Sequence, residues 1–335
     1  MAFNRHQKGP LLDLIVQSLY DDGWGIIYLH DPQWHPFILR IYKEDIKIDV
    51  RIYIWKLTHG GGSARAADEY RIQITGVDQF EPQENGVTLI LGWWNEGGVF
   101  AGFDYHFHSG ILGSSPSIQI REEALRSAYV NGFSTWAKEN HEIAIAVRPD
   151  LLGEYMQNLG RLHSFGQSQA DLALLNAAMA TNQDPNDAAL ETVTMERRTV
   201  IAQVTKKMRD IGFKKRVLEA YGFTCAFCGL QLKLIDAAHI LPVENDGTDE
   251  TWNGIALCAL HHRAYDRNLI TFDERYQILR NRRALDNLSS ISHGGERQQF
   301  EANLRAMIIL PPSRDDRPHV ESVRHANHIR GWEIS

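Results

Sequence analysis

The sequence is poor in cysteine, and the few cysteines it has lie close together. Among 335 residues there are three, Cys225, Cys228 and Cys258. An odd number of cysteines, in a chain without an evident export signal, argues against a disulfide framework. Because all three fall within 34 residues, their clustering indicates a metal site. The alternative is a set of buried thiols without a ligand.

Long hydrophobic runs are also missing. No stretch of about 18 apolar residues occurs, so no membrane-spanning helix is predicted. The N-terminal apolar stretch is short, contains Asp13 and has no small-residue cleavage site, which favours an amphipathic helix over a signal peptide. We therefore expect a cytoplasmic protein with no membrane contact. Its 43% hydrophobic and 23% charged residues are typical of a globular chain, and its length allows two domains.

The chain has no overall excess of positive charge. Its net charge of −7 argues against coating nucleic acid through bulk electrostatics. The two halves differ, however: residues 1–195 hold 14 Lys+Arg against 24 Asp+Glu, and residues 196–335 hold 21 against 18. A locally basic surface in the second half could still contact phosphates, with ordinary solvated charge as the alternative.

The first part of the chain mixes strand and helix patterns. Alternating or β-branched stretches predict strands, and two stretches have helical spacing; the strands are expected at 48–58, 70–76 and 142–147, and the helices at 121–130 and 149–162. We therefore expect a mixed α/β domain over residues 1–165. Residues 166–195 are polar and Ala-rich and are interrupted at Asp184-Pro185-Asn186, which predicts a partly helical linker.

Two stretches of this domain could contact nucleic acid. A glycine-rich loop lies beside Arg65 and Arg71 and could approach a phosphate backbone, although it lacks the Lys-Ser/Thr ending of a P-loop. Trp93, Trp94 or Tyr105 could stack on a base or line a pocket for a flipped base. Packing in the core is the alternative for these aromatics.

From residue 196 onward the pattern changes, and a second domain over 196–335 is expected. The stretch 196–222 predicts one or two basic helices. After the first two cysteines, the expected order is a strand, a turn-rich loop, a helix and a final strand, at 232–243, 246–254, 255–270 and 270–278.

The cysteines fit a structural zinc site together with one histidine. Cys225-x-x-Cys228 presents two thiolates to one ion, and Cys258 and His261 lie at i and i+3 of the predicted helix, on one face. The four residues form a Cys3His set, which is a common closed tetrahedral zinc site. A finger of the two-Cys two-His type is disfavoured, because it needs two histidines three to five residues apart.

The neighbouring histidine, His262, points about 100° away from His261 on a helix. Asp266 lies at i+4 from His262 and therefore on its face. An imidazole and a carboxylate one turn apart suit a divalent ion such as Mg²⁺, Mn²⁺ or Ni²⁺. Two further polar residues belong with them, His239 in the predicted strand and Asn253 in the loop.

At intervals of 14 and 9 residues, His239, Asn253 and His262 resemble the HNH nuclease motif on its ββα-metal hairpin–helix fold. The flanking stretches CAFCG, AAHILPV and NGIALCALHHRAYD are similar to those of zinc-bearing HNH endonucleases of restriction systems. The resemblance covers about residues 213–278. It implies an α+β protein, in which an N-terminal mixed α/β recognition domain precedes a ββα-metal HNH nuclease domain with structural zinc.

The resemblance also implies roles for these residues. His239 would be the general base, because an imidazole can deprotonate water near neutral pH. His262 and Asp266 would hold the catalytic divalent ion, and Asn253 would bond the loop backbone and keep His239 aimed. Zinc would hold together a motif that buries too little surface to fold alone.

One position departs from the family pattern. Many HNH nucleases have an acidic or histidine ligand directly before the catalytic histidine, where this chain has Ala238. Asp236 lies on the same strand face as Ala238 by the period of two, and it could substitute through a water molecule.

Together these observations predict a metal-dependent DNA endonuclease of the restriction or defence kind, whose N-terminal domain selects a DNA sequence or a modified base. Its substrate would be double-stranded DNA. Since one HNH hairpin holds one ion and cuts one strand, we expect a homodimer on DNA. Two alternatives stay open: a nuclease effector gated by a signalling ligand or partner, and a non-catalytic zinc DNA-binding module.

Overall fold

The structure is a computed structural model that describes residues 5–60, 66–181 and 190–332. The chain divides into two compact units, Met1–Met208 and Arg209–Ser335. The division falls within helix α7 (Met195–Ala220), later than the predicted domain start at residue 196. In the described residues no helix combines the length and hydrophobicity needed to cross a membrane.

The first unit is built on a mixed sheet, to which nine strands contribute in the described part of the chain. The main path of the sheet runs β1-β2-β3-β5-β6-β9-β8, while β4 pairs with β3 and β7. Only the β3–β5 pair is parallel among the strand pairs of the described residues. The strands are β1 (Gly25–Tyr28), β2 (Phe37–Lys43), β3 (Ile46–His59), β4 (Glu69–Gln73), β5 (Val87–Trp94), β6 (Val99–Phe103), β7 (Ser117–Arg121), β8 (Phe133–Ala137) and β9 (Ile143–Val147).

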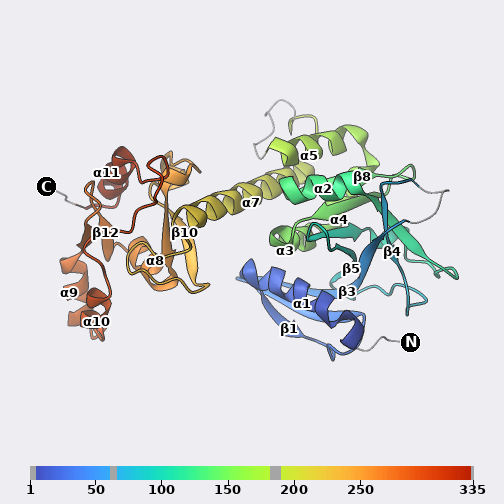
Figure 1. Cartoon of the computed structure of the whole chain (residues 1–335), viewed down its shortest axis with the longest axis horizontal. Helices are drawn as coiled ribbons and strands as arrows, with labels where there is room; N and C mark the ends of the chain where they lie inside the picture. Colours follow the sequence, from blue (N-terminus) through green and yellow to red (C-terminus); the bar gives the residue numbers. More distant parts are fainter. Residues whose placement is uncertain (1–4, 61–65, 182–189, 333–335) are drawn as a thin grey trace. The chain divides into compact units, whose positions relative to one another are not determined.

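Helices cover both faces of the sheet around β6. Ala101 and Phe103 share a core cluster with residues of α2, whereas a Cβ added at Gly102 would clash with Tyr155 of α3. Successive strand residues point to opposite faces, so α2 and α3 lie on opposite sides of the sheet (Figure 1). The helices of this unit are α1 (Arg5–Asp21), α2 (Glu122–Asn131), α3 (Leu152–Gln157), α4 (Leu159–Ser164) and α5 (Gln169–Thr181).

The predicted strands and helices of the N-terminal domain are present. The three strand predictions correspond to β3, β4 and β9, and the two helix predictions to α2 and to the pair α3 and α4. Trp93 and Trp94 on β5 are only 7% and 3% exposed. They therefore pack in the core, which was the alternative to contact with a base. Helix α5 lies within the predicted linker 166–195, while the glycine-rich loop around Arg65 and the break at residues 184–186 lie outside the described residues.

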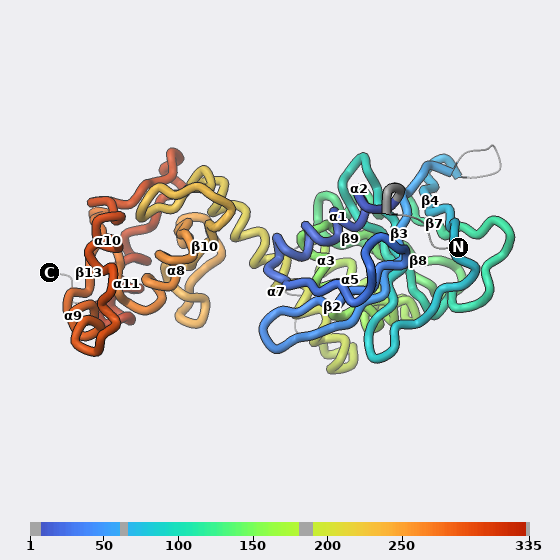
Figure 2. The backbone as a smooth tube through the Cα atoms, turned by 90° about the horizontal axis from the view of Figure 1, so that it is seen from below, coloured from blue at the N-terminus to red at the C-terminus, as the bar shows by residue number. Residues whose placement is uncertain are grey.

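The second unit begins with the C-terminal part of α7, and the segment that carries Cys225 and Cys228 leads from it to a hairpin and a helix. Strands β10 (Ile235–His239) and β11 (Gly254–Cys258) are antiparallel, with His239 paired to Gly254 and Ile235 to Cys258. Helix α8 (Ala259–Asp266) follows directly and contacts both strands, which completes a ββα arrangement (Figures 1 and 2). The remaining elements are β12 (Ile270–Phe272), β13 (Ile278–Arg280), α9 (Arg282–Ser290), α10 (Arg297–Ala302) and α11 (Val320–Ile329).

Two of the predicted elements of this unit were wrong in their extent. The helix predicted over 255–270 begins only at Ala259, because Ile255–Cys258 is a fully buried part of β11; a short apolar run does not distinguish a buried strand from a helix. The final strand predicted over 270–278 is a hairpin of β12 and β13. Its turn forms because the Asp273 carboxylate accepts hydrogen bonds from the backbone N–H groups of Arg275 and Gln277.

Candidate active site and metal centre

The three cysteines and His261 come together in one cluster. Their ligand atoms all lie within 4.8 Å of one another, and the described residues contain no other group of three or more His, Cys, Asp or Glu side chains arranged in this way. The His261 Nδ1 lies 3.5 Å from the Cys225 Sγ and 3.3 Å from the Cys258 Sγ. In a tetrahedral site with zinc bonds of about 2.3 Å to sulfur and 2.0–2.1 Å to nitrogen, these atoms would be about 3.6 Å apart. The four residues could therefore hold a metal ion.

His261 is buried beside the cysteines and two aromatic rings. The residue is 2% exposed, and its ring centroid is 6.0 Å from that of Phe227 and 5.7 Å from that of Phe300. Its Nε2 is buried without a hydrogen-bond partner among the described residues. The Nδ1 faces the cysteine sulfurs and could bind a metal ion, whereas the Nε2 lacks the hydrogen-bond partner that metal-bound histidines usually have.

The thiols in the cluster perturb one another. Burial raises the pKa of the Cys225 thiol, but the bond with His261 and backbone N–H groups together lower it to about 6. Burial raises the pKa of Cys228 to about 12, and the charge of Cys225 adds to this shift. Burial and the charge of Cys225 also raise the pKa of Cys258. Without a cation only one of the three thiols ionises readily, so a bound divalent ion would stabilise the full set of thiolates.

His239 lies at the end of β10 and is held on two sides. Its Nε2 donates to the Asp249 carboxylate at 2.9 Å, and its ring stacks on that of Phe213 in α7, with centroids 3.8 Å apart and planes 3° from parallel. The Nδ1 has no hydrogen-bond partner among the described residues, and the side chain is 25% exposed. His239 therefore presents one nitrogen that can accept a proton.

Asn253 fixes the loop that carries Asp249. The residue is fully buried. Its Oδ1 accepts from the backbone N–H of Leu241 at 3.0 Å, and its Nδ2 donates to the carbonyl oxygens of Leu241 and Thr248 at 2.9 and 2.8 Å. These three bonds join the two ends of the loop between β10 and β11. The side chain thereby acts on His239 indirectly, through the loop backbone.

Two glycines allow the close approach of backbone segments at this site. A Cβ added at Gly254, the strand partner of His239, would come within 2.2 Å of Val217 Cγ2 and 3.0 Å of Phe213 Cζ. At Gly247 an added Cβ would lie 1.9 Å from the Leu241 carbonyl oxygen. Gly254 lets Phe213 reach the imidazole, and Gly247 lets the loop fold back on itself.

His262 and Asp266 lie on the outer face of α8, one turn apart. The His262 Nε2 is 3.6 Å from the Asp266 Oδ2, and the two side chains are 28% and 58% exposed. Two ligands of one octahedral ion with bonds of about 2.0–2.1 Å are separated by about 3–4 Å. The pair therefore fits a hydrated divalent ion with two protein ligands.

The position before His239 offers no ligand. Ala238 is 4% exposed and belongs to the core of the unit. Asp236, the candidate substitute, has a 47% exposed side chain whose Oδ1 accepts from the Lys214 ammonium at 2.7 Å. The structure therefore gives Asp236 a cationic partner of its own.

Two residues around His239 were not found from the sequence. Asp249 lies in a stretch with Asp246 and Glu250, and nothing in the sequence separates one loop carboxylate from the next. Phe213 is one apolar residue among many in α7, 26 positions before His239. The one sequence signal for Asp249 was its short separation from Asn253 along the chain, which places both residues in one predicted loop.

Comparison with known proteins agrees with this geometry. Residues 225–273 match the family model of the HNH endonuclease. This part of the chain is therefore an HNH endonuclease domain, and the protein is a nuclease. The match spans the hairpin, α8 and the Cys3His cluster, and it confirms the predicted resemblance to HNH endonucleases. Residues 48–156 match the family model Methylase-associated X1.

Other comparisons add little. No curated protein matches the chain. Among solved structures it is similar to a "Modification dependent TagI restriction endonuclease", at 11% identity and a TM-score of 0.30, over 85% of this chain and 81% of that one. A likeness with so low a TM-score supports no conclusion about fold or function.

Proposed function

We propose that the protein is a metal-dependent DNA endonuclease of the restriction or defence kind. The observation that carries the proposal is the placement of His239, Asn253 and the His262–Asp266 pair on one ββα hairpin, inside the segment that matches the HNH endonuclease model. The description of the N-terminal match as methylase-associated supports a role in a restriction–modification setting. The first unit would select the DNA sequence or a modified base.

In the proposed reaction His239 takes a proton from the attacking water through Nδ1. Asp249 holds the opposite nitrogen at 2.9 Å, and it stabilises the imidazolium that forms when the proton arrives. Phe213 restricts rotation of the ring by stacking on one face. Asp249 and Phe213 are thus positioning residues, and His239 is the group that touches the reacting water.

His262 and Asp266 would hold the catalytic divalent ion, Mg²⁺ or Mn²⁺ with Ni²⁺ as a further candidate. When bound, such an ion supplies positive charge that stabilises the negative charge on the scissile phosphate and the leaving oxygen. Cys225, Cys228, Cys258 and His261 would hold a structural zinc ion. This division assigns the two neighbouring histidines to two different metals.

The test is cleavage of matched plasmids, one unmodified and one carrying methylated or hydroxymethylated cytosine, with Mg²⁺ or Mn²⁺ added. We expect cleavage of one plasmid over the other, and loss of cleavage with His239→Ala while DNA binding persists. Binding by the wild-type protein without cleavage of either plasmid would instead favour a non-catalytic zinc DNA-binding module.

We also propose that the protein acts as a homodimer on double-stranded DNA, because one hairpin holds one ion and cuts one strand. Mass measurement on a target duplex, combined with the order in which nicked and linear plasmid appear, tests this. A monomer on DNA that converts circles directly to linear molecules would contradict it.

A further inference from the structure

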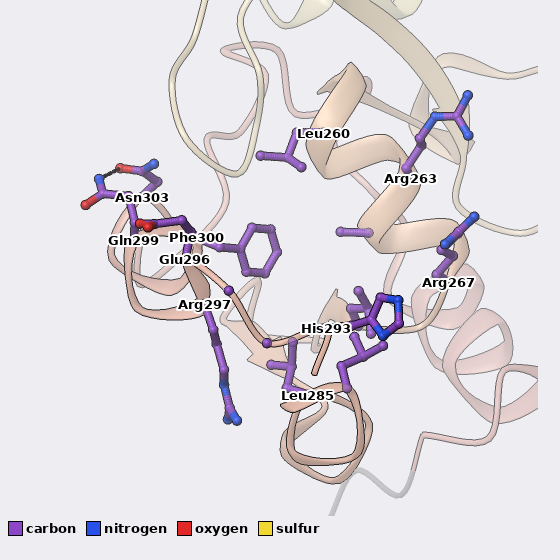
Figure 3. A pocket seen from close by; sticks show the side chains of 15 residues that line it. Leu260, Arg263, Arg267, Leu285, His293, Glu296, Arg297, Gln299, Phe300 and Asn303 are labelled. Carbon is purple, nitrogen blue, oxygen red and sulfur yellow. Dashed lines mark hydrogen bonds between the residues drawn. The ribbon is translucent and has the colours of Figure 1, made fainter. Parts of the chain in front are cut away.

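The second unit contains a cavity of about 560 Å³ that the proposed reaction does not use. It lies between α8 on one side and α9, α10 and the segment joining them on the other (Figure 3). None of His239, Asn253, His262 and Asp266 lines it. Its volume falls in the range of about 300–1,000 Å³ that is typical of small-molecule sites.

The middle of the cavity is apolar. Ala264 and Leu285 are buried at 5% exposure each, and Phe300 of α10 contributes an aromatic ring. Leu260 of α8 also lines the cavity, yet it is 60% exposed. A flat apolar group bound here would contact the Phe300 ring and cover the Leu260 side chain.

Two arginines without an ion pair to a described residue lie along one side of the cavity. Arg263 and Arg267 are exposed, one helical turn apart, and neither forms an ion pair with a described residue. Arg297 also lines the cavity, but its guanidinium is held by Asp286 at 2.7 Å and Glu301 at 2.6 Å. The free arginines are therefore the ones available to an anionic ligand.

The opposite side is polar, and Arg297 on that side is already held by two carboxylates. Figure 3 shows Arg263, Arg267 and His293 on one side of the cavity, and Glu296, Arg297, Gln299 and Asn303 on the other. The head groups of Arg263 and Arg267 point outward from the cavity, so they would turn toward a ligand bound at its rim. The Gln299 Nε2 donates to the Asn303 Oδ1 at 3.2 Å. This bond leaves the Gln299 carbonyl oxygen and the Asn303 amide hydrogens for a ligand that has both acceptors and donors.

We propose that this cavity binds a nucleotide. The phosphate would pair with Arg263 and Arg267, the base would stack on Phe300, and the base edge would meet the amides of Gln299 and Asn303. An aromatic ring with a nearby guanidinium is a general platform for a base and its phosphate. The nucleotide is either free or part of the DNA strand, and the same chemistry recognises both. The inference goes beyond the proposed cleavage and does not depend on it.

The experiment measures binding by calorimetry on the full-length protein, without added divalent ions. The probes are dAMP, dGMP, dCMP and dTMP, inorganic phosphate, and a 20-base-pair duplex. The double variant Arg263→Gln/Arg267→Gln is compared with Arg275→Gln, which removes an exposed arginine of the same unit outside the cavity. The variant Phe300→Leu removes the ring, and zinc content verifies that each variant keeps the neighbouring cluster.

If the ligand is a free nucleotide, at least one mononucleotide binds the wild-type protein more tightly than phosphate does. The double variant and Phe300→Leu then weaken that binding tenfold or more, and Arg275→Gln does not. If the nucleotide belongs to DNA, the same variants weaken duplex binding by that factor while mononucleotides bind weakly. The proposal is overturned if inorganic phosphate binds as tightly as every nucleotide. It is also overturned if Arg275→Gln weakens ligand binding as much as the double variant does. Plasmid cleavage, assayed separately, reports on the proposed nuclease function.

Discussion

Replacing each of the two adjacent histidines by alanine should have opposite consequences for stability and for chemistry. His261 is buried beside the cysteines, whereas His262 has a 28% exposed side chain that faces Asp266. His261→Ala removes one ligand of the proposed zinc. His262→Ala removes one ligand of the proposed catalytic ion and leaves the cysteine cluster complete.

The expected magnitudes differ widely. Structural zinc contributes about 10–16 kcal/mol in finger peptides, so losing even a third of this would cost about 4 kcal/mol. For a unit of this size that corresponds to a fall in Tm of more than about 10 °C. The exposed His262–Asp266 pair contributes at most about 1 kcal/mol, hence a change of a few degrees or less. Cleavage should nevertheless fall by orders of magnitude in His262→Ala, since charge stabilisation at the phosphate is lost.

The assay measures zinc per chain, Tm and plasmid cleavage for the two variants, with His239→Ala as a matched control. His239→Ala should behave like His262→Ala, with zinc and Tm retained and cleavage lost. If His262→Ala lost zinc while His261→Ala kept it and cut DNA normally, the assignment of the two neighbours would be reversed. Loss of the same metal in both variants would falsify the idea of two separate sites.

Three further predictions follow from single contacts. Asp249→Ala should lower kcat about 10–100-fold at unchanged DNA affinity, with partial rescue by Asp249→Glu; an equal loss in both variants, or a loss of affinity instead of kcat, would contradict a positioning role. Gly254→Ala should destabilise the protein by about 1–3 kcal/mol, because its Cβ would meet Val217 and Phe213, whereas Gly295→Ala meets nothing within 4 Å and should leave Tm unchanged. Burial lowers the pKa of Lys8 to about 6, so above that pH the unfolded chain binds more protons than the folded one, and the free energy of unfolding should rise between about pH 6 and 10, by up to about 6 kcal/mol. Lys8→Met should flatten this rise, as measured from denaturant midpoints. The same pH slope in Lys8→Met as in the wild-type protein would show that Lys8 stays protonated in the folded state.

The metal cluster could be predicted because its information is local. The Cys-x-x-Cys knuckle and the Cys-x-x-His pair each fix two ligands within one turn of chain, and no other cysteine competes for the site. The histidine spacing likewise led to the HNH resemblance, which the family match confirms. The extent of the helix was the weak point, since Cys258 lies at its N-terminal cap and not inside it.

The contacts around His239 could not be predicted, because they depend on segments far apart in the sequence. Phe213 reaches the imidazole only because α7 packs against β11 at Gly254. Asp249 reaches it only because Asn253 folds the loop back. Neither contact leaves a periodic pattern or a fixed spacing, so the sequence alone offered several equivalent loop carboxylates.

The hairpin also connects the proposed zinc site with the proposed catalytic residues. Strand β11 pairs with His239 at Gly254 and with Ile235 at Cys258, so its first residue lies beside the proposed base and its last belongs to the metal cluster. Helix α8 starts immediately after Cys258, its N-cap residue, so the cluster lies where β11 passes into the helix that carries His262. If the cluster opened, β11 and α8 would lose their common anchor, and the proposed base and ion ligands would separate although every catalytic side chain remained. Removal of zinc should thus abolish cleavage even when the catalytic divalent ion is in excess, and adding zinc back should restore it.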